Sequence, residues 1–80
     1  MDTIRISTIL SFITYLVDEG TIVQGYIMLN ADEAKVHTTA DSIRLTVLKS
    51  HNNFRYIKYG DTIYRDNGSD PCKWYPLCDV

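Results

Sequence analysis

Residues 38–50 read TTADSIRLTVLKS, and this stretch decides the fold because it fits two periodicities. As a helix that begins at a threonine cap, it turns Ala40, Ile43 and Val47 inward but leaves Leu45 on the polar side. As a strand, it places Ile43, Leu45 and Val47 on one face, and Leu48 no longer fits. The two patterns predict different folds, and both stay open at this point.

Upstream of this stretch, the spacing of apolar residues predicts an amphipathic helix over residues 7–18. Positions at the i, i+3, i+4 and i+7 spacing of one helical face are Ile6, Ile9, Leu10, Ile13, Leu16 and Val17. Gly20 follows, and glycine can take the left-handed conformation that ends many helices. The apolar run is shorter than the roughly 20 residues of a membrane span. We therefore expect a cytoplasmic protein without a membrane segment.

Downstream, residues 54–65 predict a β-hairpin. Two strand-like runs flank Gly60-Asp61, which suits a two-residue type II′ turn because glycine comes first. The expected register pairs Tyr59 with Thr62, Ile57 with Tyr64 and Arg55 with Asp66. The opposite face then carries Tyr56, Lys58, Ile63 and Arg65 as a basic and aromatic surface.

The remaining segments have weaker signals. Residues 21–29 fit a strand or a short helix, and residues 31–35 look like one or two helical turns that follow an Asn30 cap. Residues 66–80 are expected to form a loop and a tail that docks on the core through Trp74, Tyr75 and Leu77. The whole chain, residues 1–80, is predicted to be a single small domain.

Charge is unevenly distributed along the chain. Residues 35–65 hold six of the eight Lys and Arg residues but only two of the ten Asp and Glu, a net charge of +4, whereas the remainder carries −6. Such asymmetry is typical of a surface that meets phosphate or an acidic partner, and it favours a binding module over an enzyme. Because the domain is small, we also consider a homodimer formed through the helix at residues 6–17.

No catalytic or metal-binding pattern emerges from the sequence. His37 and His51 are the only candidate bases near neutral pH, and no phosphate-binding loop or nucleophile elbow accompanies them. Cys72 and Cys78 lack the further ligands that zinc needs, so we expect reduced thiols, with a disulfide as the alternative. The prediction is a protein that is not an enzyme and that has no metal and no cofactor.

The order of helix, strand-like segment, short helix, helix and hairpin over residues 7–65 resembles the winged helix-turn-helix superfamily. The resemblance rests on residues 38–44 as the start of a recognition helix, on Leu48-Lys49 and on the wing-like hairpin. It implies a small regulatory protein, of viral, plasmid or prophage type, that binds double-stranded DNA through the major groove. The DNA-facing residues that it implies are Thr39, Ser42, Arg44 and Lys49 on the helix, with Arg55, Lys58 and Arg65 on the wing.

The strand pattern for residues 38–50 predicts a different protein. In that case the N-terminal helix packs on an antiparallel sheet of four or five strands. The basic hairpin and the tail would then form a patch that binds an acidic surface of a host or competitor protein. A third option, in which tyrosines 56, 59 and 64 stack single-stranded bases, follows from the aromatic content of the hairpin.

Overall fold

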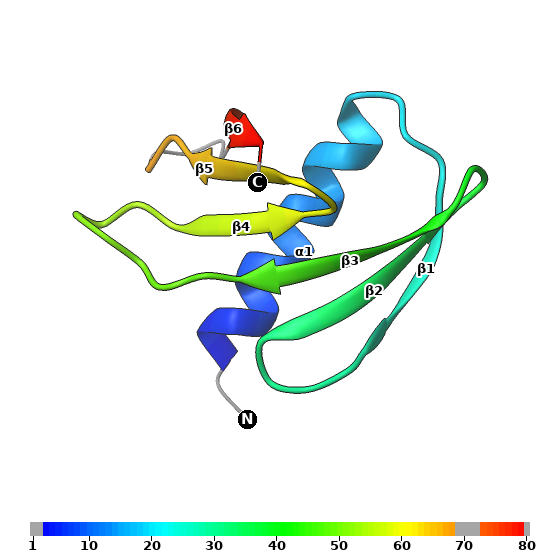
Figure 1. Cartoon of the computed structure of the whole chain (residues 1–80), viewed down its shortest axis with the longest axis horizontal. Coiled ribbons are helices and arrows are strands. Elements are labelled where there is room, and N and C mark those ends of the chain that lie inside the picture. Colours follow the sequence, from blue (N-terminus) through cyan, green and yellow to red (C-terminus); the bar gives the residue numbers. More distant parts are fainter. Residues whose placement is uncertain (1–2, 69–72, 80) are drawn as a thin grey trace.

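The protein has one helix packed on a single antiparallel sheet, so its fold class is α+β (Figure 1). The computed structural model describes residues 3–68 and 73–79. Six strands follow the helix, and each pairs with its neighbour in sequence order. The elements are α1 (Thr3–Asp18), β1 (Val23–Met28), β2 (Glu33–Thr38), β3 (Ser42–Val47), β4 (Tyr56–Tyr59), β5 (Thr62–Asp66) and β6 (Trp74–Asp79).

The decisive segment is a strand. β3 places Leu45 opposite Ala34 on β2 and Tyr59 on β4, and the Leu45 side chain is fully buried. A helix would have left this leucine on its polar side, so burial of Leu45 favours the extended conformation. The expected recognition helix is therefore wrong. Within the described residues α1 is the only helix, and the alternative of a helix packed on an antiparallel sheet describes the fold.

The sheet is larger than the expected four or five strands, because two ambiguous segments are also extended. β2 covers most of the segment that looked like a short helix. Asn30 caps a turn rather than a helix, since its side-chain oxygen accepts a hydrogen bond of 2.8 Å from the Asp32 amide. β6 replaces the expected irregular tail, and its Pro76 is compatible with a strand because β6 lies at the edge of the sheet.

The β4–β5 hairpin has the expected register. Tyr59 lies opposite Thr62 and Ile57 opposite Tyr64, and the Asp66 amide donates to the Arg55 carbonyl over 3.1 Å. Gly60 has a φ of 61°, which suits the first position of a type II′ turn. The hairpin prediction is confirmed, and so is the alternation of its two faces.

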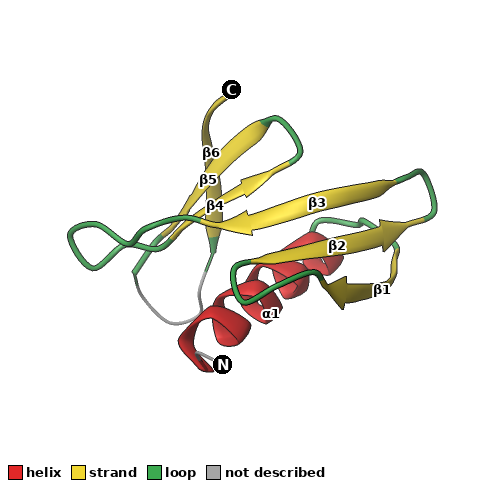
Figure 2. Cartoon of the chain, turned by 60° about the horizontal axis from the view of Figure 1, so that its bottom comes forward, coloured by secondary structure: helices red, strands yellow, loops and turns green. Residues whose placement is uncertain are grey.

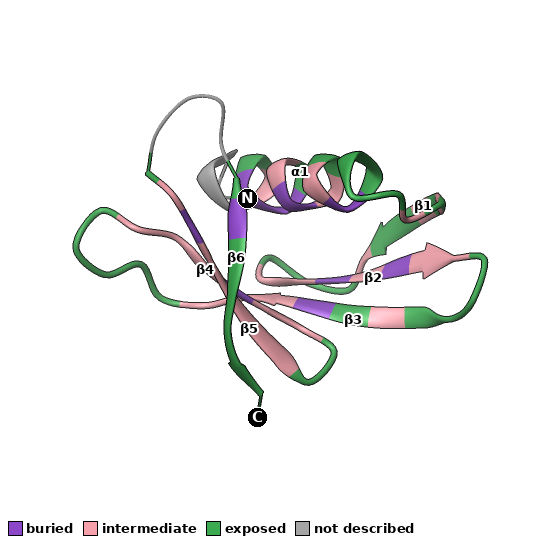
Figure 3. Cartoon of the chain, turned by 90° about the horizontal axis from the view of Figure 1, so that it is seen from above, coloured by how far each residue is buried: buried purple, intermediate pink, exposed green. Residues whose placement is uncertain are grey.

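One face of the sheet is covered by α1, which lies along it in two views (Figures 2 and 3). The buried side chains of the helix are Thr8, Ile9, Phe12 and Leu16, whereas Leu10 and Val17 are exposed. The packed face is therefore rotated from the predicted one. Phe12 causes the rotation, because its ring packs against Tyr59, Tyr64 and Trp74 with centroid distances of 4.9 to 5.4 Å.

Further expectations concern the N-terminal helix and the C-terminal tail. Ile9, Phe12 and Leu16 of the helix pack against its own sheet, whereas Leu10 and Val17 are exposed, and a homodimer through this helix stays a prediction. In β6, Trp74 docks on the core as expected, but Tyr75 and Leu77 are exposed. The helix ends at Asp18, and Gly20 follows it with a φ of 95°, in the left-handed conformation expected after the end of a helix. No helix in residues 3–68 and 73–79 is long and apolar enough to cross a membrane.

Candidate binding face

The face of the sheet opposite α1 carries a group of cationic side chains. In β2 the buried Ala34 and Val36 face the helix, so Lys35 between them faces away from it. The same alternation applies to Arg44 beside the buried Leu45 and to Lys58 beside the buried Ile57. Arg65 follows Tyr64, whose ring contacts Phe12 of the helix. We call this set the basic face, and it consists of Lys35, Arg44, Lys58 and Arg65.

Strand pairing brings these cations close together. Lys35 on β2 lies directly opposite Arg44 on β3. Lys58 on β4 lies opposite Thr46, which is two residues after Arg44 on β3. Like charges directly opposite one another destabilise a sheet. This arrangement therefore opposes folding, and a ligand of negative charge would relieve the repulsion.

Among the described residues, an acid pairs with only one of the four cations. Arg44, whose side chain is 61% exposed, lies 3.5 Å from the Glu33 carboxylate. Asn30 donates a further hydrogen bond to Glu33, and together these contacts keep the pKa of the Glu33 carboxyl below its ordinary value. Within residues 3–68 and 73–79, Lys35, Lys58 and Arg65 form no ion pair. Their charges are available to a partner.

Arg65 is held in place by an aromatic ring. Its guanidinium carbon lies 4.5 Å from the centroid of the Phe54 ring, which is a cation–π contact. Its Nε atom is buried and has no hydrogen-bond partner among the described residues. Phe54 closes a tight turn at Asn52-Asn53, both at positive φ, through two backbone hydrogen bonds with His51. The arm between β3 and β4 thus orients an arginine on the basic face.

The structure separates the predicted DNA-facing residues. Arg44, Lys58 and Arg65 lie on the basic face, and Ser42 is on the same side of the sheet, opposite His37. Thr39 is exposed in the turn between β2 and β3, and Lys49 is exposed on the arm that follows β3. Sequence analysis missed Lys35 as a member of the site. The alternation in Glu33–Thr38 was the signal that could have found it, since Ala34 and Val36 alternate with charged residues.

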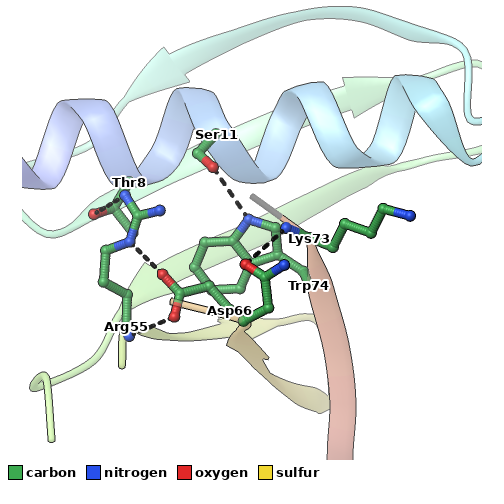
Figure 4. A network of polar contacts seen from close by, with 7 residues as sticks. Thr8, Ser11, Arg55, Asp66, Lys73 and Trp74 are labelled. Carbon is green, nitrogen blue, oxygen red and sulfur yellow. Dashed lines mark hydrogen bonds and ion pairs between the residues drawn. The ribbon is translucent and has the colours of Figure 1, made fainter. Parts of the chain in front are cut away.

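Arg55, the other wing residue that the resemblance implied, has a structural role (Figure 4). Its backbone amide and its guanidinium both bond to the Asp66 carboxylate, with the amide at 3.0 Å. The guanidinium also lies 5.6 Å from the centroid of the Trp74 ring, and it reaches Thr8 of α1 at 3.5 Å. Trp74 in turn donates to Ser11 over 3.3 Å. This network ties the helix to β5 and β6, away from the basic face.

The tyrosines also divide between the two faces. Tyr59 and Tyr64 point toward α1, and burial is the main cause that raises the pKa of both hydroxyls. Of the three tyrosines expected to stack on bases, Tyr56 alone lies on the side of the basic face, opposite Arg65. The prediction of a three-tyrosine stacking surface is therefore wrong.

Neither histidine lies in a cleft. His37 Nδ1 is 2.8 Å from the Ser42 hydroxyl, but this contact is exposed on the open sheet. The described part of the chain contains no cluster of three metal-ligating side chains. Cys78 is exposed on β6, and Cys72 lies outside the described residues, so the expectation for this pair is not addressed.

A hollow of about 590 Å³ lies elsewhere, at the C-terminal end of α1. Its walls are formed by Tyr15, Asp18, Glu19, Lys73, Trp74, Tyr75 and Pro76. It is wide open and mixes both signs of charge, so it does not select one class of ligand. The basic face is the stronger candidate. Comparisons of the chain with profiles of known families, with curated proteins and with solved structures gave no match.

Proposed function

We propose that this chain is a binding protein that attaches to an acidic surface of a partner protein through its basic face. One observation carries the proposal. Four cations project from the one sheet face that the helix leaves uncovered, although the chain as a whole has a net charge of −2. A local field of this kind steers an acidic partner toward one side of the molecule.

The surroundings of the cations favour a protein partner over a nucleic acid. Arginine and tyrosine are enriched among residues that dominate binding energy, and Arg65 lies opposite Tyr56 with Phe54 beneath its guanidinium. An arginine that is already oriented loses less freedom on binding. Two of the three tyrosines that could have stacked on bases, Tyr59 and Tyr64, face the helix instead.

Binding of double-stranded DNA is the second candidate function, now without a recognition helix. The observation in its favour is that Lys35, Lys58 and Arg65 form no ion pair within the described residues. Strands can also bind DNA, since some regulators place a β-ribbon or a sheet against a groove. Such binding would rest on phosphate contacts and would weaken steeply with salt.

The test compares two double charge reversals. Lys35→Glu with Lys58→Glu alters the basic face, and Lys49→Glu with Lys73→Glu makes the same change of charge at two exposed lysines outside it. Each variant and the wild type are immobilised, and proteins captured from a lysate are compared by mass spectrometry at low and high salt. We expect acidic proteins that the wild type and the second variant capture and that the first variant loses.

A parallel titration with a short random-sequence DNA duplex at the same two salt concentrations separates the two candidates. Duplex binding that the first variant loses, without any captured protein that depends on the basic face, would replace the proposal with DNA binding. If the two variants capture the same proteins and bind the duplex equally, the basic face serves neither function.

A further inference from the structure

The two edges of the sheet are protected to different degrees. β1 pairs only with β2, and β6 pairs only with β5, so each strand has one side without a neighbouring strand. Edge strands expose unpaired backbone groups, and proteins usually protect them with proline or with charged side chains. β6 contains Pro76 and ends at Asp79. β1, with the sequence VQGYIM, contains neither a proline nor a charge.

The unprotected edge is also the most apolar part of the surface. Half of the large hydrophobic residues that are exposed in the described part of the chain lie on β1 or beside it, namely Ile22, Tyr26, Ile27 and Leu29. No charged residue occurs between Glu19 and Asp32. An exposed apolar edge of this kind, six residues long with a register irregularity between Val23 and Gly25, is a template for pairing with a further strand.

We propose that β1 pairs in antiparallel fashion with β1 of a second copy of this chain, which gives a two-fold symmetric dimer with a continuous sheet. A two-fold axis places the same strand on both sides of the interface, so any charge on β1 would face a like charge. The absence of charge on β1 removes this obstacle. Glu19 and Asp32, the nearest charged residues, both lie outside the strand.

Antiparallel pairing of the two β1 strands determines which faces of the two chains lie on the same side of the dimer. Antiparallel neighbours within one sheet are related by an axis perpendicular to it, so both copies of α1 lie on one side and both basic faces on the other. Ile27 lies opposite Lys35 and is therefore on the side of the basic face, whereas Tyr26 lies opposite Val36 on the helix side. The register that we propose pairs Ile27 with Ile27 of the second copy, so the two side chains meet at the axis. The proposal of this dimer does not depend on which ligand the basic face binds.

Charge complementation at Ile27 tests the dimer. The side chain of Ile27 is 52% exposed in the single chain, so Ile27→Lys and Ile27→Glu should both fold, which circular dichroism would confirm. Leu77→Lys on β6 is the matched control, since Leu77 is 49% exposed on the other edge. Sedimentation velocity over a concentration series should show the wild type and Leu77→Lys at the mass of two 9.2 kDa chains. Each Ile27 variant should be monomeric, and an equimolar mixture of the two should dimerise again.

Hydrogen exchange of the wild type gives a second readout that does not depend on variants. If the backbone edge is paired, the amides of Val23–Met28 should exchange more slowly as the protein concentration rises. The proposal fails if the wild type remains monomeric up to its solubility limit. It also fails if Leu77→Lys, rather than the Ile27 variants, abolishes the dimer, or if mixing the two Ile27 variants restores nothing.

Discussion

The Asp66 carboxylate and the Arg55 guanidinium form an ion pair beneath Trp74, with side-chain exposures of only 3% and 28% (Figure 4). Asp66 also accepts a hydrogen bond from the Arg55 amide. The pair lies beneath α1, where the residue just before β4 meets the end of β5 and the start of β6. Its position explains why the positive charge of Arg55 does not contribute to the basic face.

Replacement of Asp66 by Asn should destabilise the protein by about 2 to 4 kcal/mol, because it leaves Arg55 partly buried without a counter-charge. Urea unfolding followed by tryptophan fluorescence would measure the change. Glu33→Gln, which removes the acidic partner of the exposed Arg44, is the matched control and should have little effect. Equal losses in the two variants would contradict the structural role of the buried pair.

The rotated face of α1 predicts opposite results at two neighbouring positions. Phe12→Ala should cost about 3 to 5 kcal/mol, or prevent folding, because it removes a ring that contacts four other aromatic residues. Leu10→Ala should change the free energy of unfolding by no more than about 0.5 kcal/mol, since Leu10 is exposed. Thermal and urea unfolding measure both. A larger loss at Leu10 than at Phe12 would restore the helix face predicted from the periodicity.

Replacement by alanine should change the free energy of unfolding differently at Gly60, which is in a turn, and at Gly25, which is in a strand. Gly60→Ala should destabilise by about 1 to 3 kcal/mol, because a φ of 61° is strained for a residue with a Cβ. At Gly25, where no heavy atom lies within 4 Å of an added Cβ, alanine should be neutral or should stabilise by roughly 0.5 to 1 kcal/mol. Urea midpoints of the two variants give the comparison. Similar effects would mean that the turn at Gly60 is not type II′.

Two partly buried tyrosines, Tyr59 and Tyr64, predict a loss of stability at alkaline pH. The pKa values of Tyr59 and Tyr64 are raised from the ordinary 10.0, chiefly by burial, so the fold favours their neutral forms. A raised pKa of this kind leaves stability intact below pH 10.0 and removes it as the pH climbs through the folded-state values. The free energy of unfolding should therefore fall above pH 10.0.

Phenylalanine variants identify the groups responsible. Tyr59→Phe with Tyr64→Phe should flatten the alkaline decline, because neither side chain can ionise. Tyr26→Phe with Tyr75→Phe replaces two exposed tyrosines and should leave the decline as in the wild type. Urea unfolding at a series of pH values measures all three proteins. An unchanged slope in the first variant would show that other groups cause the loss.

Sequence reasoning succeeded where a local signal was sufficient. The α1 helix has strong apolar periodicity, and the hairpin has a glycine at the turn position that requires a positive φ. The hairpin register follows from that turn, and the alternation of β4 and β5 then places Lys58 and Arg65 on one side. Such reasoning predicted three residues of the basic face, Arg44, Lys58 and Arg65, from their positive charge.

Tertiary structure decided what local signals left open. Residues 38–50 fit two periodicities, and only the neighbouring strands determine which one buries Leu45. β6 contains a proline and lacks a strand-like alternation of burial, so its strand character depends on its place beside β5. The sequence by itself determined the helix, the hairpin and the charge asymmetry. The tertiary structure joined cations from four strands into one face and put Arg55 in a partly buried ion pair with Asp66, because strand pairing connects residues that are distant in the chain.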